Sequence, residues 1–344
     1  MEAIGKSRDD NSAEITKIKN SKLFIEHNQN VAALPIAYSA FTKKHKRLVC
    51  FLIAFAGMFS PLSSFIYYPA ITSLAKDLDV SIELINLTIT SYMVVSGIAP
   101  AIIGDLTDVT GRRWVYILTL LIYCAADVGL ALQRSWSALL VLRMLQSLGS
   151  SATISIAYGV VADISSPAER GSFVGAVLCG PNIAPSLGPV IGGALSQHAG
   201  WWWIFWFLAL LSGLCLALIV LFLPETSRLK VGNGSVAAKR YHQTALSLIL
   251  KKSPKDDLGN NDQISSRRGF HIPNPITCLR LLLHRSTALI VLVNGVFYMT
   301  YGCIQASMSS LFIQLYGFNQ LEAGLIYLPF GVGCALASFL SGHI

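Results

Sequence analysis

The sequence predicts an all-α membrane protein, and two observations carry that prediction. Of the 344 residues, 53% are hydrophobic and only 13% are charged, whereas about a quarter of a typical soluble domain is charged. The apolar residues are also gathered into long runs separated by short polar segments. A helix needs about 20 such residues to cross the roughly 30 Å hydrocarbon core of a bilayer, and most of the runs are about that long.

Taken in order, the chain divides into four parts. Residues 1–46 are polar, lack the apolar run of a signal peptide, and are expected to form a disordered tail. Residues 47–223 form a bundle of six spans, 224–286 a polar linker with a short amphipathic helix expected around 245–250, and 287–344 the start of a second bundle. The spans are expected at 48–69, 85–103, 114–132, 138–162, 173–195, 201–223, 287–305 (extending as far as 313) and 323–340.

The distribution of Lys and Arg predicts the orientation. With the N-terminus inside, nearly every basic residue falls on the cytoplasmic side; Lys76 and Arg134 lie in outer loops and Arg143 lies within a span. Cytoplasmic loops are enriched in Lys and Arg, so the tail and the linker are expected to be cytoplasmic. The net charge of +8 therefore reflects topology, and we expect no nucleic acid among the partners.

Several function classes are disfavoured. The seven cysteines are scattered, without a CxxC or a His/Cys cluster, so no metal site, cofactor or disulfide framework is expected. The sequence offers no nucleophile–base pairing and no phosphate loop, so we expect no enzyme.

Arg143 is the most informative single residue. A charge inside a span costs at least about 2.5–3.5 kcal/mol, so it faces protein or water rather than lipid. Gln146, Ser147, Ser150 and Thr153 continue a polar stripe along the same helical face. The stripe favours a water-filled cavity over an arginine that reaches up to the outer headgroups. Asp127 in the preceding span is a candidate proton site or a partner for Arg143, and the sequence does not choose between them.

A second stripe and a breaker-rich span complete the intramembrane features. Asn294, Tyr298, Tyr301 and Gln305 share one face of the seventh span, and a wall that faces solute is favoured there over helix–helix hydrogen bonds. The fifth span is dense in helix breakers, which argues against a straight helix and fits either a tight packing seam or a hinge. These residues are Gly180, Pro181, Asn182, Pro185, Gly188, Pro189, Gly192 and Gly193.

Charged residues gather where spans end on the cytoplasmic side. One set lies in the expected turn 104–113, a second flanks the turn after the fourth span, and a third closes the sixth span. Their members are Gly104, Asp108, Gly111, Arg112 and Arg113; Asp163 and Arg170; Glu225 and Arg228. They are either solvated helix ends or a network that breaks and reforms as a gate.

Together these residues resemble the major facilitator superfamily. The turn matches the signature between spans two and three through Gly104, Leu106, Asp108, Gly111, Arg112 and Arg113, and residues 142–149 look like the fourth-span motif that contains Arg143. Gly188, Pro189, Gly192 and Gly193 match the fifth-span antiporter motif, with Ala184 where the family has glycine. The Asp163 and Arg170 pair and residues 224–228 match two further motifs. Residues 66–70, 85–88 and 179–182 are similar to twelve-span fungal drug:proton antiporters of the quinidine-resistance type.

The resemblance implies a major facilitator type helix bundle, with a complete first half and two spans of the second. Because the family has twelve spans, we expect a chain truncated after span eight. The implied activity is proton-coupled export of small drugs, weak acids or organic cations by alternating access, in the plasma membrane and as a monomer. Arg143 and Asp127 would couple protons, while Gln146, Ser150, Asn182 and the second stripe would line the solute path. The alternatives are nutrient uptake by the same fold, a fragment that transports nothing and, outside this fold, a seven-span receptor.

Overall fold

Every element in the described part of the chain is a helix, which confirms the all-α prediction. The computed structural model describes residues 38–39, 41–232 and 283–341. Seven helices within these ranges are long and apolar enough to cross a membrane. The expected helix at 245–250 lies outside the described residues.

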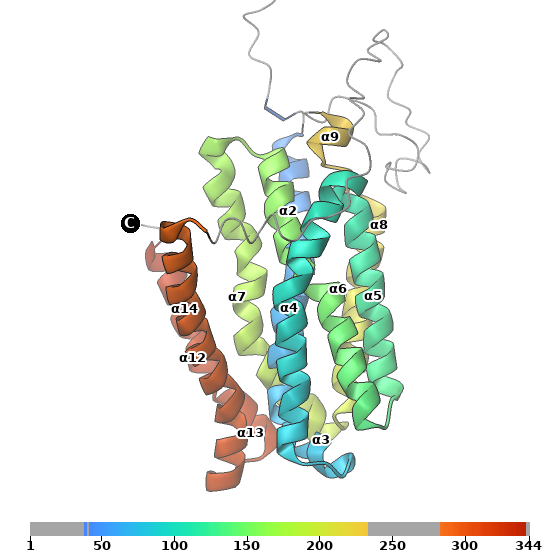
Figure 1. The fold of residues 1–344 in the computed structure, drawn as a ribbon, viewed down its shortest axis with the longest axis vertical. Coiled ribbons are helices and arrows are strands. Elements are labelled where there is room, and N and C mark those ends of the chain that lie inside the picture. Colours follow the sequence, from blue (N-terminus) through green and yellow to red (C-terminus); the bar gives the residue numbers. More distant parts are fainter. Residues whose placement is uncertain (1–37, 40, 233–282, 342–344) are drawn as a thin grey trace, which may run out of the picture. The chain divides into compact units, whose positions relative to one another are not determined.

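Six long helices form the first bundle, and short helices connect or follow them (Figure 1). In this bundle α2 packs against α6, α7 and α8, α5 packs against α6 and α8, and α4 packs against α6. The elements are α2 (Lys43–Phe65), η1 (Tyr68–Ala70), α3 (Ile71–Asp77), α4 (Ile82–Thr110), α5 (Arg112–Leu132), α6 (Trp136–Ile164), α7 (Pro167–His198), α8 (Trp202–Phe222) and α9 (Arg228–Val231).

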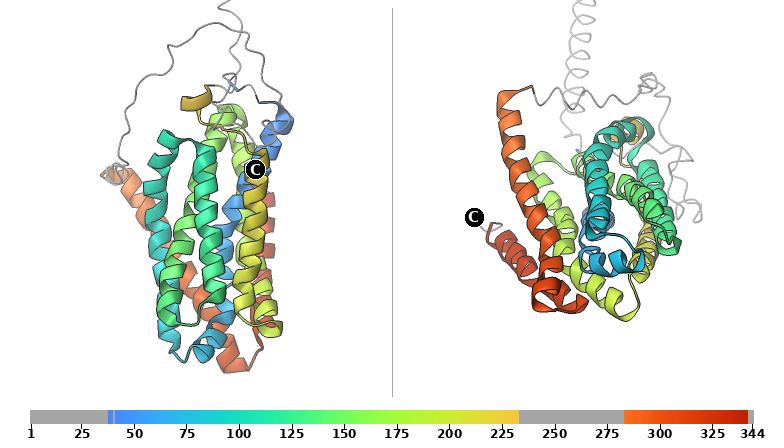
Figure 2. Two further views of the ribbon diagram at one scale, coloured as in Figure 1. Left: turned by 90° about the vertical axis from the view of Figure 1, so that its right-hand side faces the viewer. Right: turned by 60° about the horizontal axis from the view of Figure 1, so that its bottom comes forward.

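Three further helices begin the second bundle. They are α12 (Arg285–Tyr316), α13 (Gln320–Leu325) and α14 (Leu328–Ser341). Both α13 and α14 pack against α7, and α12 contacts η1 and α13 (Figures 1 and 2). The most apolar stretch of α12 is 0% buried by the described residues. The expected eighth span therefore corresponds to α13 and α14, which are separated by a break at residues 326–327.

Local chemistry explains several helix ends. Ser81 accepts a hydrogen bond from the backbone N–H of Leu84 and so caps α4, and Asn319 and Glu322 form a reciprocal capping box at the start of α13. Gly317 ends α12 in the left-handed conformation, which glycine adopts without steric cost. These capping residues lie in the polar segments a few residues outside the expected spans, which begin at 85 and 323 and end by 313.

One local prediction is wrong. Residues 104–113 are not a turn, because α4 continues to Thr110 and the chain reverses at Gly111 alone, with φ of 103°. Polar residues outside hydrocarbon can continue a helix, so the end of an apolar run does not end the helix. Helix α7 remains continuous through Pro181, Pro185 and Pro189, as membrane helices allow when their neighbours satisfy the freed backbone groups. The expectation that it is not straight stays a prediction.

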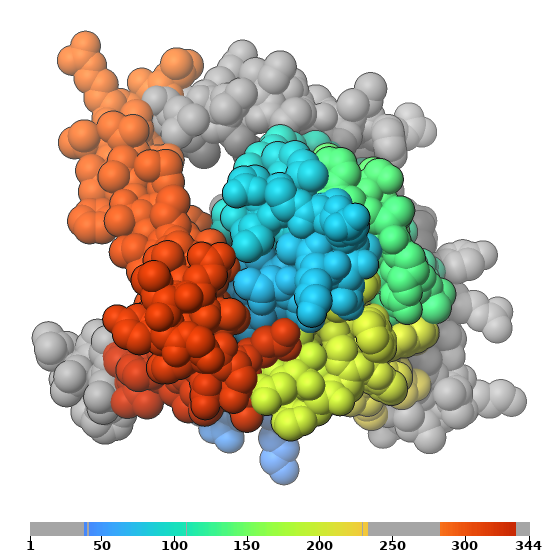
Figure 3. Space-filling view, turned by 90° about the horizontal axis from the view of Figure 1, so that it is seen from below, coloured from blue at the N-terminus to red at the C-terminus, as the bar shows by residue number. Residues whose placement is uncertain are grey.

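The two ends of the first bundle differ in their residues. We call the end where α2, α5 and α7 begin the basic end, because it carries Lys46, Arg47, Arg112, Arg113 and Arg228. The opposite end is the Trp201 end. Figure 3 views the Trp201 end, where α13, the start of α4 and the junction of α7 with α8 form a close-packed surface.

Candidate solute and proton site

Arg143 lies at the centre of the first bundle and is 0% exposed. Its guanidinium is stacked between two aromatic rings, with the Cζ atom 4.4 Å from the ring centre of Tyr67 and 4.6 Å from that of Tyr92. One terminal nitrogen donates to the carbonyl oxygen of Ser63 at 3.2 Å and to the side-chain oxygen of Gln146 at 2.6 Å. Cation–π contacts and charge-assisted hydrogen bonds thus replace part of the water that a buried guanidinium loses. Nε and Nη2 of Arg143 have no hydrogen-bond partner among the described residues.

Gln146 links Arg143 to Asp127. Its amide oxygen accepts from Arg143, and its amide nitrogen donates to Oδ1 of Asp127. Asp127 is also 0% exposed, and its Oδ2 has no hydrogen-bond partner among the described residues. An intramembrane carboxyl group with one free oxygen can bind and release a proton, and the amide can pass the change in charge to Arg143.

Further hydrogen bonds connect this cluster to three helices. The Tyr92 hydroxyl donates to the carbonyl oxygen of Ser60 at 2.8 Å and lies 3.0 Å from the Ser150 hydroxyl. The hydroxyls of Tyr123 and Ser63 are 2.6 Å apart. A change at Asp127 on α5 can therefore reach α2, α4 and α6 through a continuous polar network.

The polar stripe of α6 borders protein, not a cavity. Arg143, Gln146 and Ser150 are all 0% exposed, so the expectation that Gln146 and Ser150 line a solute path does not describe this conformation. The spacing of the polar residues predicts that they share one face of α6, but it does not predict which residues cover that face. It also missed Tyr92 and Tyr123, since tyrosines in apolar runs are more often packing residues than site residues.

The second stripe is only partly exposed. Tyr298 is 68% exposed and Asn294 is exposed, whereas the ring of Tyr301 packs 6.2 Å from that of Phe65 on α2. Gln305 is buried, and its backbone carbonyl accepts a hydrogen bond from the Tyr327 hydroxyl at 2.6 Å. Asn182 lies exposed on α7. Asn182, Asn294 and Tyr298 could therefore contact a solute in this conformation, and Gln305 could not.

The glycines of the fifth-span motif permit backbone contact at the Trp201 end. A Cβ atom added to Gly192 would overlap the carbonyl oxygen of Ile66, and one added to Gly193 would overlap that of Gln320. From the other side, a Cβ on Gly324 would overlap the carbonyl oxygen of Pro189. Helix α7 is thus held between the end of α2 and α13, so the first and second bundles meet closely at this end.

A network of charged residues joins the helix ends at the basic end. The Arg112 side chain pairs with Asp163 on α6 at 3.2 Å, and both side chains are largely buried. Arg228 donates two hydrogen bonds, of 3.0 and 3.1 Å, to the backbone carbonyl of Asp163. The Arg113 side chain donates to the backbone carbonyl of Val220 on α8 at 2.8 Å.

Glu225 is the acceptor that closes this network. It is 3% exposed, and its Oε1 accepts the backbone N–H groups of Arg112, Thr226 and Ser227 at 2.9 to 3.1 Å. A Cβ on Gly111 would lie 2.5 Å from the other carboxylate oxygen. Gly111 therefore meets two requirements, a positive φ and room for the carboxylate.

Most of the expected gate residues are brought together. Arg112, Arg113, Asp163, Glu225 and Arg228 share the network, and Gly104 lies within α4, which ends at Thr110. The side chain of Asp108 lies outside the described residues, and Arg170 is placed in the first turn of α7. All the contacts described here lie within the first bundle, so they brace the ends of its helices.

We expect Glu225→Ala to lower the free energy of unfolding by about 2–3 kcal/mol, because three backbone N–H groups lose their shared acceptor. Glu225→Gln keeps an acceptor oxygen and is the matched control, with a smaller loss expected. Unfolding of the purified chain in micelles with increasing dodecyl sulfate measures both. Equal stability of the two variants would show that the backbone hydrogen bonds contribute little.

Comparisons with known proteins agree with this architecture. The family model described as Major Facilitator Superfamily matches residues 53–344. The MFS-type transporter phiD of Fungal sp. (strain ATCC 74256) is 42% identical over 88% of this chain and 46% of its own length. Citrate exporter 1 of Aspergillus niger is 35% identical over 88% of this chain and 58% of its own. The multidrug transporter QDR2 of Candida glabrata is 34% identical over 88% of this chain and 52% of its own length.

A solved structure shows the same fold at low sequence identity. The superposition on the proton:xylose symporter XylE has a TM-score of 0.60 and 15% sequence identity. It covers 87% of this chain and 70% of the XylE chain. The chain spans about half the length of the curated relatives that it matches. Several apolar helices and relatives that are transporters rather than enzymes identify a multi-pass membrane protein. The match over residues 53–344 means that this chain belongs to the major facilitator superfamily.

Proposed function

We propose that this chain supplies the first bundle, and the start of the second, of a proton-coupled exporter of small organic solutes. The observation that carries the proposal is the buried cluster of Arg143, Gln146 and Asp127, which places a carboxyl group and a guanidinium on opposite sides of one amide. Two of the relatives are named for export of citrate and for multidrug transport. Ionisable groups in membrane interiors commonly mark ion and proton pathways.

The proposed cycle alternates access around the middle of the bundle. The basic end is assigned to the cytoplasm because it carries most of the Lys and Arg residues. Contact between α7 and α13 closes the Trp201 end in this conformation, while the most apolar stretch of α12 is 0% buried by the described residues. Protonation of Asp127 would remove its negative charge and weaken the hydrogen bond between Gln146 and Arg143. Arg143 would then be held less firmly, and its hydrogen bond to the Ser63 carbonyl on α2 would loosen.

The remaining assignments belong to the same proposal. Protons, one small organic solute and the lipid bilayer are the partners, and the transporter acts as a monomer in the plasma membrane. Asn182, Asn294 and Tyr298 contact the solute in this conformation, and Gln146 and Ser150 do so after the cluster opens. The network of Arg112, Asp163 and Glu225 holds the first bundle rigid while it rocks, and Asp108 and Arg170 join it.

The test uses proteoliposomes that hold a chimera, in which this chain replaces the matching segment of phiD. Ethidium, naphthalene-2-sulfonate and citrate serve as solutes, so that the result does not depend on solute class. An antiporter accumulates its solute in vesicles with an acidic interior, because protons leave as the solute enters. We expect such accumulation for at least one solute. Accumulation only in vesicles with an alkaline interior would indicate symport, and no accumulation would contradict the proposal.

A further inference from the structure

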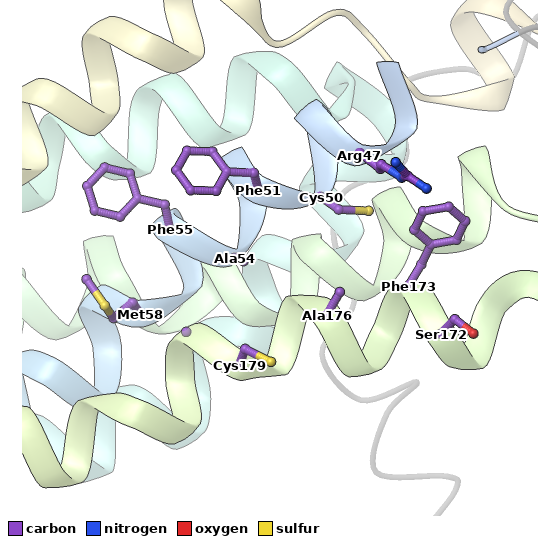
Figure 4. A pocket seen from close by; sticks show the side chains of 11 residues that line it. Arg47, Cys50, Phe51, Ala54, Phe55, Met58, Ser172, Phe173, Ala176 and Cys179 are labelled. Carbon is purple, nitrogen blue, oxygen red and sulfur yellow. The ribbon is translucent and has the colours of Figure 1, made fainter. Parts of the chain in front are cut away.

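A groove separates the halves of α2 and α7 that lie toward the basic end (Figure 4). It has a volume of about 640 Å³, which lies within the range of small-molecule sites. A Cβ on Gly180 would lie 2.5 Å from the carbonyl oxygen of Ala54, so the two backbones touch there and form the floor. Aromatic and thioether side chains form most of the walls, from Phe51, Phe55 and Met58 on α2 and Phe173 on α7.

Among the residues that the structure describes, one cation and no acid line this groove. Arg47 lies at one end and Met58 at the other (Figure 4). The nearby carboxylate of Glu169 is paired with Lys46 at 3.1 Å, and Lys46 lies over the ring of Phe173 at 5.9 Å. The charge presented to a ligand is therefore positive and confined to one end, while the rest of the surface is apolar.

The face of α2 that lines the groove also reaches the second bundle, at the opposite end of the helix. Phe51, Phe55, Met58 and Phe65 lie on one face of α2, because they are spaced by three, four or seven residues. The ring of Phe65 on this face packs against Tyr301 of α12. Phe51, at the other end of the same face, is 62% exposed. One continuous face of α2 thus runs from the groove to the contact with α12.

We infer that this groove is the first binding site of the exported solute, and that the solute is an amphipathic organic monoanion. The carboxylate or sulfonate head binds the Arg47 guanidinium, and the aromatic or aliphatic body packs against Phe51, Phe55 and Phe173. An organic cation would find no carboxylate in the lining. A polyanion such as citrate would bury charges that a single guanidinium cannot compensate. This inference rests on the proposed function and names its solute class.

A native thiol reports on occupancy of the groove. Cys179 is exposed and lines it, whereas Cys303 is exposed on α12 and is absent from its lining. The full chain in phosphatidylcholine nanodiscs is treated with N-ethylmaleimide, and modification at each cysteine is followed by peptide mass spectrometry. Naphthalene-2-sulfonate at about ten times its Kd is expected to slow modification of Cys179 about tenfold. It should leave the rate at Cys303 unchanged.

Matched variants and ligands make the result specific. In Arg47→Gln, protection of Cys179 is expected to need at least about a tenfold higher sulfonate concentration. Lys44→Gln removes an exposed charge outside the groove and should leave protection unchanged. The cation naphthalene-2-methylammonium has the same ring system and should not protect. Equal protection by the cation, or undiminished protection in Arg47→Gln, would overturn the inference.

Lipid is the competing occupant, and transport is measured separately. If phosphatidylglycerol nanodiscs slow modification of Cys179 and the sulfonate adds nothing, the groove binds lipid and the inference fails. Protection needs no proton gradient, whereas accumulation by the chimera does. Loss of protection with intact accumulation would contradict only the groove site. Intact protection without accumulation would contradict the proposed function and leave the anion site in place.

Discussion

Replacing Gly193 with valine is expected to abolish export by the chimera. A Cβ at this position would overlap the carbonyl oxygen of Gln320 and lie 3.1 Å from the Cα of Leu321, so α13 must move away from α7. Overpacking of this kind costs about 1–3 kcal/mol, which lowers the population of a conformation about 5–150-fold. Because we propose that this contact closes the Trp201 end, the variant should favour conformations in which this end is open. Solute accumulation in proteoliposomes measures the effect.

The matched control is Gly175→Val on the same helix. A Cβ at Gly175 meets nothing within 4 Å, so the same change in composition adds no overlap. We expect this variant to accumulate solute at close to the wild-type rate. If both variants are equally impaired, valine in α7 acts through the helix itself, and the proposed closing contact would have no special role.

Arg143→Gln is expected to lower proton-driven accumulation more than 100-fold while the protein still inserts in the membrane. Removing one partner of a buried charged cluster costs about 3–5 kcal/mol, and here it leaves Asp127 and Gln146 without a cation. The rings of Tyr67 and Tyr92 would also lose the planar guanidinium between them. Insertion is followed by size-exclusion chromatography of the detergent extract, and accumulation by the proteoliposome assay.

Two further variants separate charge from geometry. Arg143→Lys keeps the charge but cannot stack between two rings, so we expect partial activity. Arg134→Gln also removes one positive charge, from an exposed arginine stacked on Trp201 and Trp202 at the Trp201 end. It should leave accumulation unchanged. Wild-type accumulation by Arg143→Gln would remove Arg143 from the coupling mechanism.

The sequence predicts the helices well because the bilayer sets their minimum length. Every expected span from 48–69 to 287–305 coincides with a helix, and most of these helices begin or end a few residues outside the apolar run. The excess belongs to polar residues such as those between Gly104 and Thr110, which lie beyond hydrocarbon but still form helical hydrogen bonds. Hydropathy identifies the part of a helix that lies in hydrocarbon and not the whole helix, so it misplaces such boundaries.

The site was harder to predict, because a helical face does not identify its neighbours. Spacing along α6 places Arg143 and Gln146 together, yet the rings that enclose Arg143 come from other elements. Arg47 illustrates the same limit. Its spacing of four and eight residues from Phe51 and Phe55 was visible, but the groove also requires α7 alongside. Chemistry within one helix could be predicted, and chemistry between helices could not.

Coupling of solute transport to protons is tested most directly by measuring proton movement that solute alone drives. Proteoliposomes with the chimera start without a pH gradient, potassium and valinomycin hold the membrane potential at zero, and a pH-sensitive dye reports the interior. The added solute carries a fixed charge, either ethidium or naphthalene-2-sulfonate, so it cannot itself move protons. We expect the interior to become alkaline as solute enters, because protons leave in exchange. In Asp127→Asn we expect solute to cross the membrane without any pH change. Solute entry without alkalinisation in the wild type, or equal alkalinisation in Asp127→Asn, would contradict the proposed coupling.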